Sequence, residues 1–306
     1  MINHENNPDY LNSFLDYTVT ILNKSPNTIK EYNYDLATFL KFIKVRFKMT
    51  DEEDFSKITI KDIPLSTIKQ IKLDDIHAFL SYLTNTYHSK AATRARKASS
   101  IRVFFNYLSQ KANLIEFNPA QNLETPKLDK RLPKYLSLED SKRLLNVAGS
   151  DDNRNNKRDY AIITLFLNCG MRLSELVGIN IKDINFSECQ MTVIGKGNKE
   201  RLVPYGNFTS DLLNNYLQFE HDGESEYLIL SRYGRPFKVD GLSNFFRKLS
   251  LLSGIDLSAH QLRHNFATNY LINQIENGSS DLFQLQLLLG HADPEVTKYY
   301  LHLAHE

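Results

Sequence analysis

The stretch QMTVIGKGNKERLVPY, from Gln190 to Tyr205, contains two runs of β-favouring residues separated by a loop with two glycines. β-Branched residues stand in both runs, and glycine gives the backbone the freedom that a tight connection needs. The pattern predicts a β-hairpin. EYLILSRYGRPF, residues 226–237, is expected to add another short strand and turn.

Segments on both sides of the hairpin have helical character. YAIITLFLNCGMRLSELVGI, residues 160–179, is an apolar run interrupted at Gly170, and the first third of the chain repeats apolar residues at helical spacing. SPNT, Ser25 to Thr28, offers a helix cap with Pro26 at the first helical position. The predicted fold class is therefore mainly α with a small antiparallel β-sheet.

A linker is expected in the middle of the chain. Pro119, Pro126 and Pro133 punctuate the polar stretch FNPAQNLETPKLDKRLPKYLS, which has no apolar periodicity. We interpret 117–135 as the linker between a helical domain, 1–116, and a second domain, 136–306; 306 residues suffice for two cores. Two such lobes could clamp a rod-shaped ligand such as duplex DNA, although any two-domain enzyme could have such a linker.

Composition narrows the class of protein only a little. The formal net charge is +1, from 37 basic and 36 acidic residues, so overall charge does not indicate nucleic acid. Apolar runs fall far short of the ~20 residues that cross a bilayer, and MINHENNPDY lacks the apolar region of a signal peptide. We expect a cytoplasmic protein. Cys169 and Cys189 lack a CxxC spacing, which argues against a structural disulfide or zinc site.

Positive charge is nevertheless clustered in SKAATRARKASSIR, residues 89–102. The stretch contains no acidic residue, and its basic residues are Lys90, Arg94, Arg96, Lys97 and Arg102. Small side chains between them would let a helix approach a phosphate backbone closely, with release of counterions. A solvated basic helix face is the alternative explanation.

The second half carries a set of basic and imidazole side chains: Arg172, Lys196, His260, Arg263 and His291. Each alone has a structural explanation, since an arginine can pair with a nearby carboxylate, a lysine can lie at a hairpin tip and a histidine can pack in a core. If they converge, they would suit a phosphate diester, whose negative charge rises as a nucleophile adds to it.

At this point the chain resembles the tyrosine site-specific recombinases, also called the phage integrase family, and within it the Xer type. The matching motifs are GMRLSEL (170–176), GKGNKER (195–201), HQLRHNFAT (260–268), LLGH (288–291) and the late Tyr300. Upstream, SPNTIKEYNYDLATFLKF resembles the first helices of the family's helical core-binding domain. The resemblance covers nearly the whole chain and implies a two-domain DNA clamp.

The resemblance also implies roles for the residues. Arg172 and Arg263 would bind the scissile phosphate, and His260 and His291 would complete the pocket. Glu175 would hold the first arginine in place. Lys196 would protonate the leaving 5′ oxygen of DNA.

Tyr300, nine positions after His291, would be the nucleophile, while Tyr299 would pack against the domain or line the site. A phenol of pKa ~10 is a poor nucleophile at neutral pH, so it needs neighbours that accept its proton and neutralise the phosphorane.

The expected reaction needs neither ATP nor a metal. A 3′-phosphotyrosine conserves the energy of the cut diester, so ATP is not required, and the arginines supply the charge that a metal would otherwise supply. GKGNKER lacks the order of a phosphate-binding P-loop, and no HExxH is present. We therefore expect no cofactor and no metal.

The expected reaction is strand exchange between two duplex DNA sites by a homo-tetramer, or by a hetero-tetramer with a related recombinase. Its role could be chromosome-dimer resolution, mobile-element integration or DNA inversion. A type IB topoisomerase-like activity and a non-enzymatic DNA-binding accessory protein are alternatives. Xer-type proteins usually continue past the nucleophile into a helix that docks on a neighbouring subunit, whereas this sequence ends at Glu306. We therefore expect that the subunits couple through other surfaces, or that the nucleophile segment is mobile or is donated to a neighbouring subunit in trans.

Overall fold

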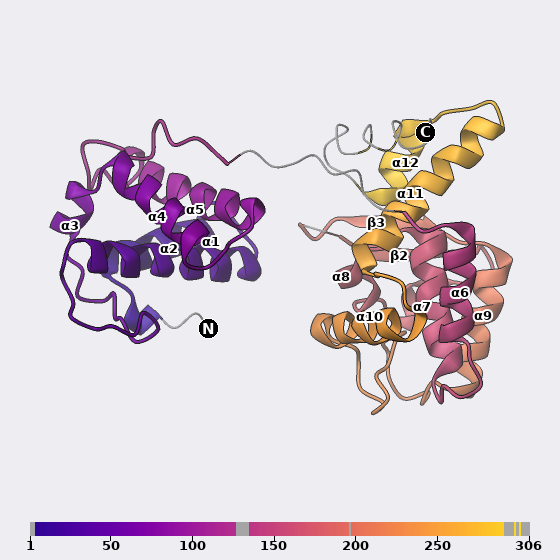
Figure 1. Cartoon of the computed structure of the whole chain (residues 1–306). Helices are drawn as coiled ribbons and strands as arrows, with labels where there is room; N and C mark the ends of the chain where they lie inside the picture. Colours follow the sequence, from indigo (N-terminus) through magenta and orange to yellow (C-terminus); the bar gives the residue numbers. More distant parts are fainter. Residues whose placement is uncertain (1–3, 127–134, 196, 291–296, 298–299, 301–306) are drawn as a thin grey trace. The chain divides into compact units, whose positions relative to one another are not determined.

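The computed structural model describes residues 4–126, 135–195, 197–290, 297 and 300. The chain divides into two compact units, Met1–Lys130 and Arg131–Glu306 (Figure 1). Within the described ranges, no helix is long and apolar enough to cross a membrane.

The first unit is helical. Its elements in chain order are η1 (His4–Asn6), α1 (Asp9–Thr20), α2 (Pro26–Arg46), α3 (Leu65–Gln70), α4 (Leu73–Asn85) and α5 (Ala91–Gln110). Helix α2 begins as predicted: the Ser25 hydroxyl accepts the backbone N–H of Thr28, and Pro26 is the first helical residue. Phenylalanine rings from α1, α2, α4 and α5 meet edge to face in one buried core.

The first part of the predicted linker contributes to that core. Ala120 and Leu123 are buried against the helices of the first unit, and the guanidinium of Arg102 donates to the Leu123 carbonyl at 2.6 Å. Residues 127–134 lie outside the described part of the chain. The domain boundaries at 116 and 136 stay a prediction.

The second unit combines helices with one small sheet. Its elements are α6 (Leu138–Ala148), α7 (Asn156–Cys169), α8 (Leu173–Leu176), η2 (Ile181–Asp183), β1 (Ile184–Asn185), β2 (Gln190–Ile194), β3 (Glu200–Pro204), α9 (Asn207–Phe219), α10 (Val239–Ser253), α11 (Ala259–Glu276) and α12 (Leu282–Leu289). Strands β2 and β3 form the predicted hairpin, and β1 extends it to a three-stranded antiparallel sheet in the described residues. The predicted fold class is confirmed.

The further strand predicted in residues 226–237 is wrong. In this described segment, regular pairing is limited to isolated bridges, from Tyr227 to Asn180 and from Leu230 to Pro236. Gly234, in the left-handed conformation at φ 68°, turns the chain back on itself between Leu230 and Pro236. Proline lacks the N–H that a regular ladder would use, and the Phe237 N–H makes the next backbone hydrogen bond, to the Ile229 carbonyl at 3.2 Å.

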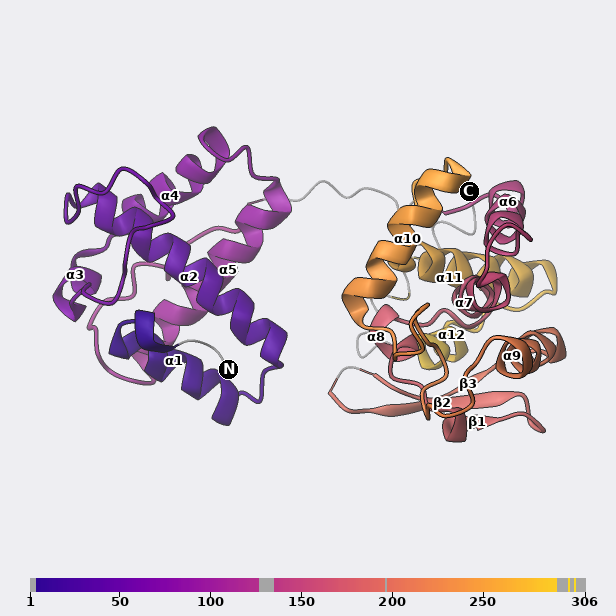
Figure 2. The same cartoon turned by 90° about the horizontal axis from the view of Figure 1, so that it is seen from below.

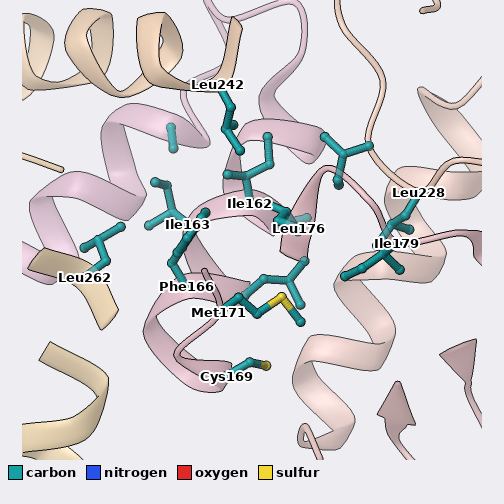
Figure 3. Close-up of a cluster of buried hydrophobic side chains, with 14 of the residues drawn as sticks. Ile162, Ile163, Phe166, Cys169, Met171, Leu176, Ile179, Leu228, Leu242 and Leu262 are labelled. Atoms are coloured by element: carbon teal, nitrogen blue, oxygen red, sulfur yellow. The ribbon is translucent and has the colours of Figure 1, made fainter. Parts of the chain in front are cut away.

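Helix α7 is the central element of the second unit. It lies between α6, α9 and α11 (Figure 2), and its apolar side chains are buried on nearly every side. Ile162, Ile163 and Phe166 meet Leu242 of α10 and Leu262 of α11 in the core shown in Figure 3. Cys169 is buried here, and both cysteines are free thiols.

Gly170 ends α7 and positions the segments that follow. Its φ of 57° is in the left-handed region, and a Cβ atom there would lie 2.3 Å from a ring carbon of Phe266 on α11. The Gly170 carbonyl accepts a hydrogen bond of 2.6 Å from Arg263. A glycine is therefore required for α11 to approach the start of α8.

We predict that Gly170→Ala lowers the free energy of unfolding by more than about 1–2 kcal/mol, the cost of the left-handed conformation, because the overlap with Phe266 adds to it. Urea unfolding of the full chain measures the difference. Gly178→Ala is the matched control, because Gly178 has no positive φ and its added Cβ would meet only ordinary contacts from 3.5 Å. Equal losses in the two variants would contradict the prediction.

Candidate active site

A buried carboxylate, Glu175, is the centre of the site. Its side chain is fully buried and accepts hydrogen bonds from Arg172 Nη1 at 2.6 Å and Arg201 Nη2 at 2.8 Å. It also accepts the backbone N–H of Arg172 at 2.8 Å, as an acid in the first turn of a helix commonly does. Nη1 of Arg263 lies 4.0 Å away. One negative charge thus faces three guanidinium groups.

The arginines keep this carboxylate ionised. Burial by itself raises the pKa of Glu175, but Arg201, the N–H of Arg172 and the two guanidinium hydrogen bonds outweigh it, so the pKa lies below its ordinary value. With Glu175 ionised, two positive charges remain in excess around it. The local charge therefore favours an anionic ligand.

The same arginines bind the end of helix α12. Arg201 donates to the carbonyl of Leu288, Arg263 to that of Leu289, and Arg172 to that of Gly290 at 2.9 Å. The last carbonyls of a helix have no partner within it and carry partial negative charge, so cations are favoured there. Segments distant in the sequence are brought together by these contacts.

Gly290 allows this close approach. Its φ is 62°, and a Cβ atom there would lie 2.9 Å from Cδ and 3.2 Å from Nε of Arg201. A larger residue would push Arg201 away from Glu175. The glycine before His291 is therefore a structural requirement of the arginine cluster.

Beside the cluster lies a cavity of about 610 Å³. Arg172, His260 and Arg263 line it together with the beginning of α11, and α10 contributes Ser243, Arg247 and Ser250 to the lining. The predicted convergence of these two arginines and His260 is thus present in the structure.

Positive surroundings change the titration of the groups in the cavity. Burial, Arg263 and Arg172 lower the pKa of His260, so its imidazole is neutral at neutral pH and able to accept a proton. Burial and Arg172 lower the pKa of Arg263 to about 10, so this guanidinium remains charged. No group of three or more His, Cys, Asp or Glu side chains within the described residues could hold a metal ion.

Tyr300 lies beside the cavity but is not part of its lining. Its side chain is buried, and its hydroxyl is 2.6 Å from Nδ1 of His264 on α11. Lys196, His291 and Tyr299 lie outside the described residues, so their predicted places in the site stay predictions.

Two residues of this arrangement were not singled out from the sequence, Arg201 and His264. For Arg201 the signal is the alternation of inward and outward residues along β3. Arg201 and Val203 face inward, whereas Glu200 and Leu202 are exposed. His264 follows His260 by four positions, which places both on one helix face. Neither pattern by itself distinguishes a site residue from an ordinary one.

The predicted DNA contact of Lys97 stays a prediction, and in the conformation described its side chain is paired within the first unit. Its ammonium group is 2.9 Å from Asp35 of α2, and the side chain is only 5% exposed. Arg96 also pairs with Asp35 at 2.8 Å and with Glu31. Two carboxylates of α2 therefore neutralise part of a cluster that is free of acids in the sequence.

The other members of the basic cluster are accessible to different degrees. Lys90 is exposed, while Arg94, Arg96 and Arg102 are partly buried; Arg94 donates to the Ser89 carbonyl. Their contacts with DNA stay a prediction.

The class of protein follows from the fold and the site taken together. The second unit is mainly helical with a small sheet, paired arginines surround a buried glutamate, a histidine lines the same cavity and a tyrosine lies near the chain end. This combination defines the class of tyrosine recombinases. Family comparison agrees: the phage integrase family model matches residues 134–306, and the model of the phage integrase N-terminal SAM-like domain matches residues 10–113. The chain belongs to the phage integrase family.

Its relatives place it near the Xer recombinases. It is 43% identical to tyrosine recombinase XerC of Caldanaerobacter subterraneus subsp. tengcongensis over 97% of this chain and 83% of that protein. It is 34% identical to XerD of Proteus mirabilis over 99% of this chain and 91% of that protein. The chain is thus a Xer-like site-specific recombinase, an enzyme class that cleaves and rejoins DNA.

Solved structures share the fold. XerH bound to a palindromic difH substrate, in a post-cleavage complex, has a TM-score of 0.69 at 20% identity, covering 96% of this chain and 92% of that one. A lambda integrase dimer bound to a core site has a TM-score of 0.66 at 19% identity, covering 94% and 96%.

We predict that Glu175→Gln lowers the free energy of unfolding at pH 7 by about 3–5 kcal/mol, because it leaves buried guanidinium groups without their counter-charge. Since the folded pKa of Glu175 is depressed below 4.5, the wild-type advantage is complete above that pH and is lost as pH falls through the folded pKa.

Urea unfolding of both proteins between pH 7 and pH 3.5 measures this advantage. Glu188→Gln, which alters an exposed glutamate of the same unit, is the control. A constant difference between wild type and Glu175→Gln across this range would refute the electrostatic account.

Proposed function

We propose that the cavity beside Glu175 binds the scissile phosphate of a duplex DNA site and that this chain exchanges DNA strands there. The observation that supports this most directly is the convergence of Arg172, His260 and Arg263 on one cavity with excess positive charge. Arginine forks can bind two phosphate oxygens each, and they neutralise the charge that develops on a phosphorane.

In this proposal Tyr300 is the nucleophile. Its oxygen forms a bond to phosphorus and its proton passes to a neutral base, for which His260 is the candidate in the cavity. The bond from phosphorus to the 5′ oxygen breaks, and Lys196 supplies the proton that this oxygen takes up. His291 completes the phosphate pocket, and Glu175 holds the arginines in place.

The product is a 3′-phosphotyrosine, from which a 5′ hydroxyl of another strand can displace the enzyme. Since the phosphodiester energy is kept in this bond, the reaction needs no nucleotide. The arginines supply the positive charge, so we propose chemistry without a metal or other cofactor.

We further propose that the two units clamp DNA, and that the chain works as a tetramer on two sites, alone or with a related recombinase. The identities to XerC and XerD favour a role in resolving chromosome dimers, and thus in chromosome partition and cell division; integration or excision of a mobile element is the alternative. Because the substrate is DNA, we propose a cytoplasmic location.

We predict that Tyr300→Phe abolishes a covalent protein–DNA complex that wild type forms, because phenylalanine lacks the attacking oxygen. Nicked suicide duplexes carrying Xer-like core sequences, and DNA flanking the gene, would be incubated with enzyme and resolved on a denaturing gel. Tyr299→Phe is the matched control and should retain a protease-sensitive band. Loss of the band in Tyr299→Phe instead would move the nucleophile by one position.

We predict that Lys90→Ala combined with Arg94→Ala weakens DNA binding and makes the plot of log K against log salt less steep by about 2, one unit for each lost phosphate contact. Arg96 is left intact because it pairs with Asp35, so its loss would disturb the fold. Titrations of one fixed duplex at several salt concentrations measure the slope.

The double variant Lys61→Ala with Lys69→Ala removes the same charge from exposed positions and serves as the control. An unchanged slope in the Lys90 and Arg94 variant would exclude these residues from phosphate contact.

A further inference from the structure

The contact between Tyr300 and His264 is the starting observation. The phenol of Tyr300 is 2% exposed and packs against Ala267, Leu271, Leu285 and Leu289. Its oxygen lies 2.6 Å from Nδ1 of His264, a short hydrogen bond for a neutral pair.

His264 connects this buried site to the cavity. Its ring contacts the ring of His260 one helical turn earlier on α11, with centroids 4.1 Å apart and planes at 74°. His260 lines the cavity, whereas neither His264 nor Tyr300 does. The reacting oxygen thus faces an imidazole behind the cavity instead of the cavity itself.

His264 and Tyr300 make this hydrogen bond as two neutral groups. Burial, His260 and Arg263 lower the pKa of His264 to about 4, so it is neutral at pH 7. A phenol is neutral below pH ~10 and can either donate its proton to Nδ1 or accept one from it, so both tautomers of a neutral His264 can make this hydrogen bond.

We propose that His264 is a positioning residue that holds Tyr300 as a neutral phenol in a buried resting position, from which the tyrosine must leave before it can attack a phosphate in the cavity. The resting position itself stands on the hydrogen bond and the packing; its relevance to catalysis rests on the proposed role of Tyr300 as nucleophile. Attack requires the oxygen within ~3–3.5 Å of phosphorus, and a phenol bonded to His264 and covered by α12 is withheld from that position.

His264 is therefore distinct in role from His260. The low pKa makes it a poor acceptor for a complete proton transfer, while the short bond makes it a good anchor for the hydroxyl. If His264 is an anchor, its imidazole slows release of the tyrosine, and removing the imidazole speeds that release. If His264 is a general base, removing the imidazole slows the chemical step. The two roles predict opposite consequences for a variant without the imidazole.

The test measures how accessible Tyr300 is to nitration by tetranitromethane in the full chain. Tyr299→Phe serves as the parent, so that the C-terminal tryptic peptide after Lys298 contains Tyr300 as its sole tyrosine. Mass spectrometry follows nitration of this peptide, and exposed Tyr34, 64% exposed, is the internal reference.

In the parent, Tyr300 should react far more slowly than Tyr34. His264→Leu should raise nitration of Tyr300 by about five- to tenfold, the factor expected for loss of one hydrogen bond of ordinary net strength. His264→Asn places an amide oxygen near the position of Nδ1 and should restore protection, whereas His264→Gln places its amide near Nε2 and should not. If the Leu variant does not fold, the comparison of the Asn variant with the Gln variant tests the hydrogen bond to Tyr300 instead. Equal protection of Tyr300 in all folded variants would overturn the proposal.

Single-turnover cleavage of a suicide duplex then separates an anchor from a base. For an anchor, His264→Leu keeps or increases the cleavage rate. A loss of about 100-fold, typical for removal of a general base, with unchanged nitration would overturn the resting-position role. If the parent itself forms no covalent complex with DNA, the proposed function fails, while the nitration series still reports on the contact.

Discussion

The ion-pair cluster around Glu175 is the constraint on which the rest of the site depends. Three guanidinium groups within reach of one another repel strongly in a buried setting, and they can share a small volume only if a negative charge lies among them. Glu175 supplies it from the first turn of α8, and its carboxylate is bound so that each oxygen meets a different part of the cluster. The carboxylate offsets only part of the charge, which leaves the excess that an anion can use.

The three arginines also hold distant parts of the chain together. They come from the start of α8, from β3 and from α11, and each donates to one of the three consecutive carbonyls at the end of α12. Two left-handed glycines make this possible, since Gly170 lets α11 approach α8 and Gly290 lets Arg201 approach the chain after α12. The backbone conformation and the arginine cluster therefore depend on each other. Without the arginines, the carbonyls at the end of α12 would lack these partners. Without the two glycines, the arginines would not fit.

Much of this was predictable from local sequence, and the reasons for the exceptions are physical. The hairpin, the break at Gly170 and the cap at Ser25 depend on residues close together in the chain, so their patterns were informative. Arg172, Glu175 and Arg263 could be assigned to one site through the spacing of family motifs. Lys97 could not be judged in the same way, because its partner Asp35 is 62 positions away and belongs to another helix.

Arg201 and His264 illustrate the same limit inside the site. Their roles arise from contacts across 87 positions, to Leu288, and across 36, to Tyr300, and local periodicity reports only which face of an element a residue occupies.

The end of α12 links the arginine cluster to the buried tyrosine. Leu289 packs against Tyr300 through its side chain, while its carbonyl accepts a hydrogen bond from Arg263. The guanidinium of Arg263 has five N–H donors, and the carbonyls of Gly170 and Leu289 take one each, so donors remain for an anion in the cavity. Leu289 therefore fixes the positions of the arginine cluster and the Tyr300 site relative to each other, because its carbonyl belongs to the first and its side chain to the second.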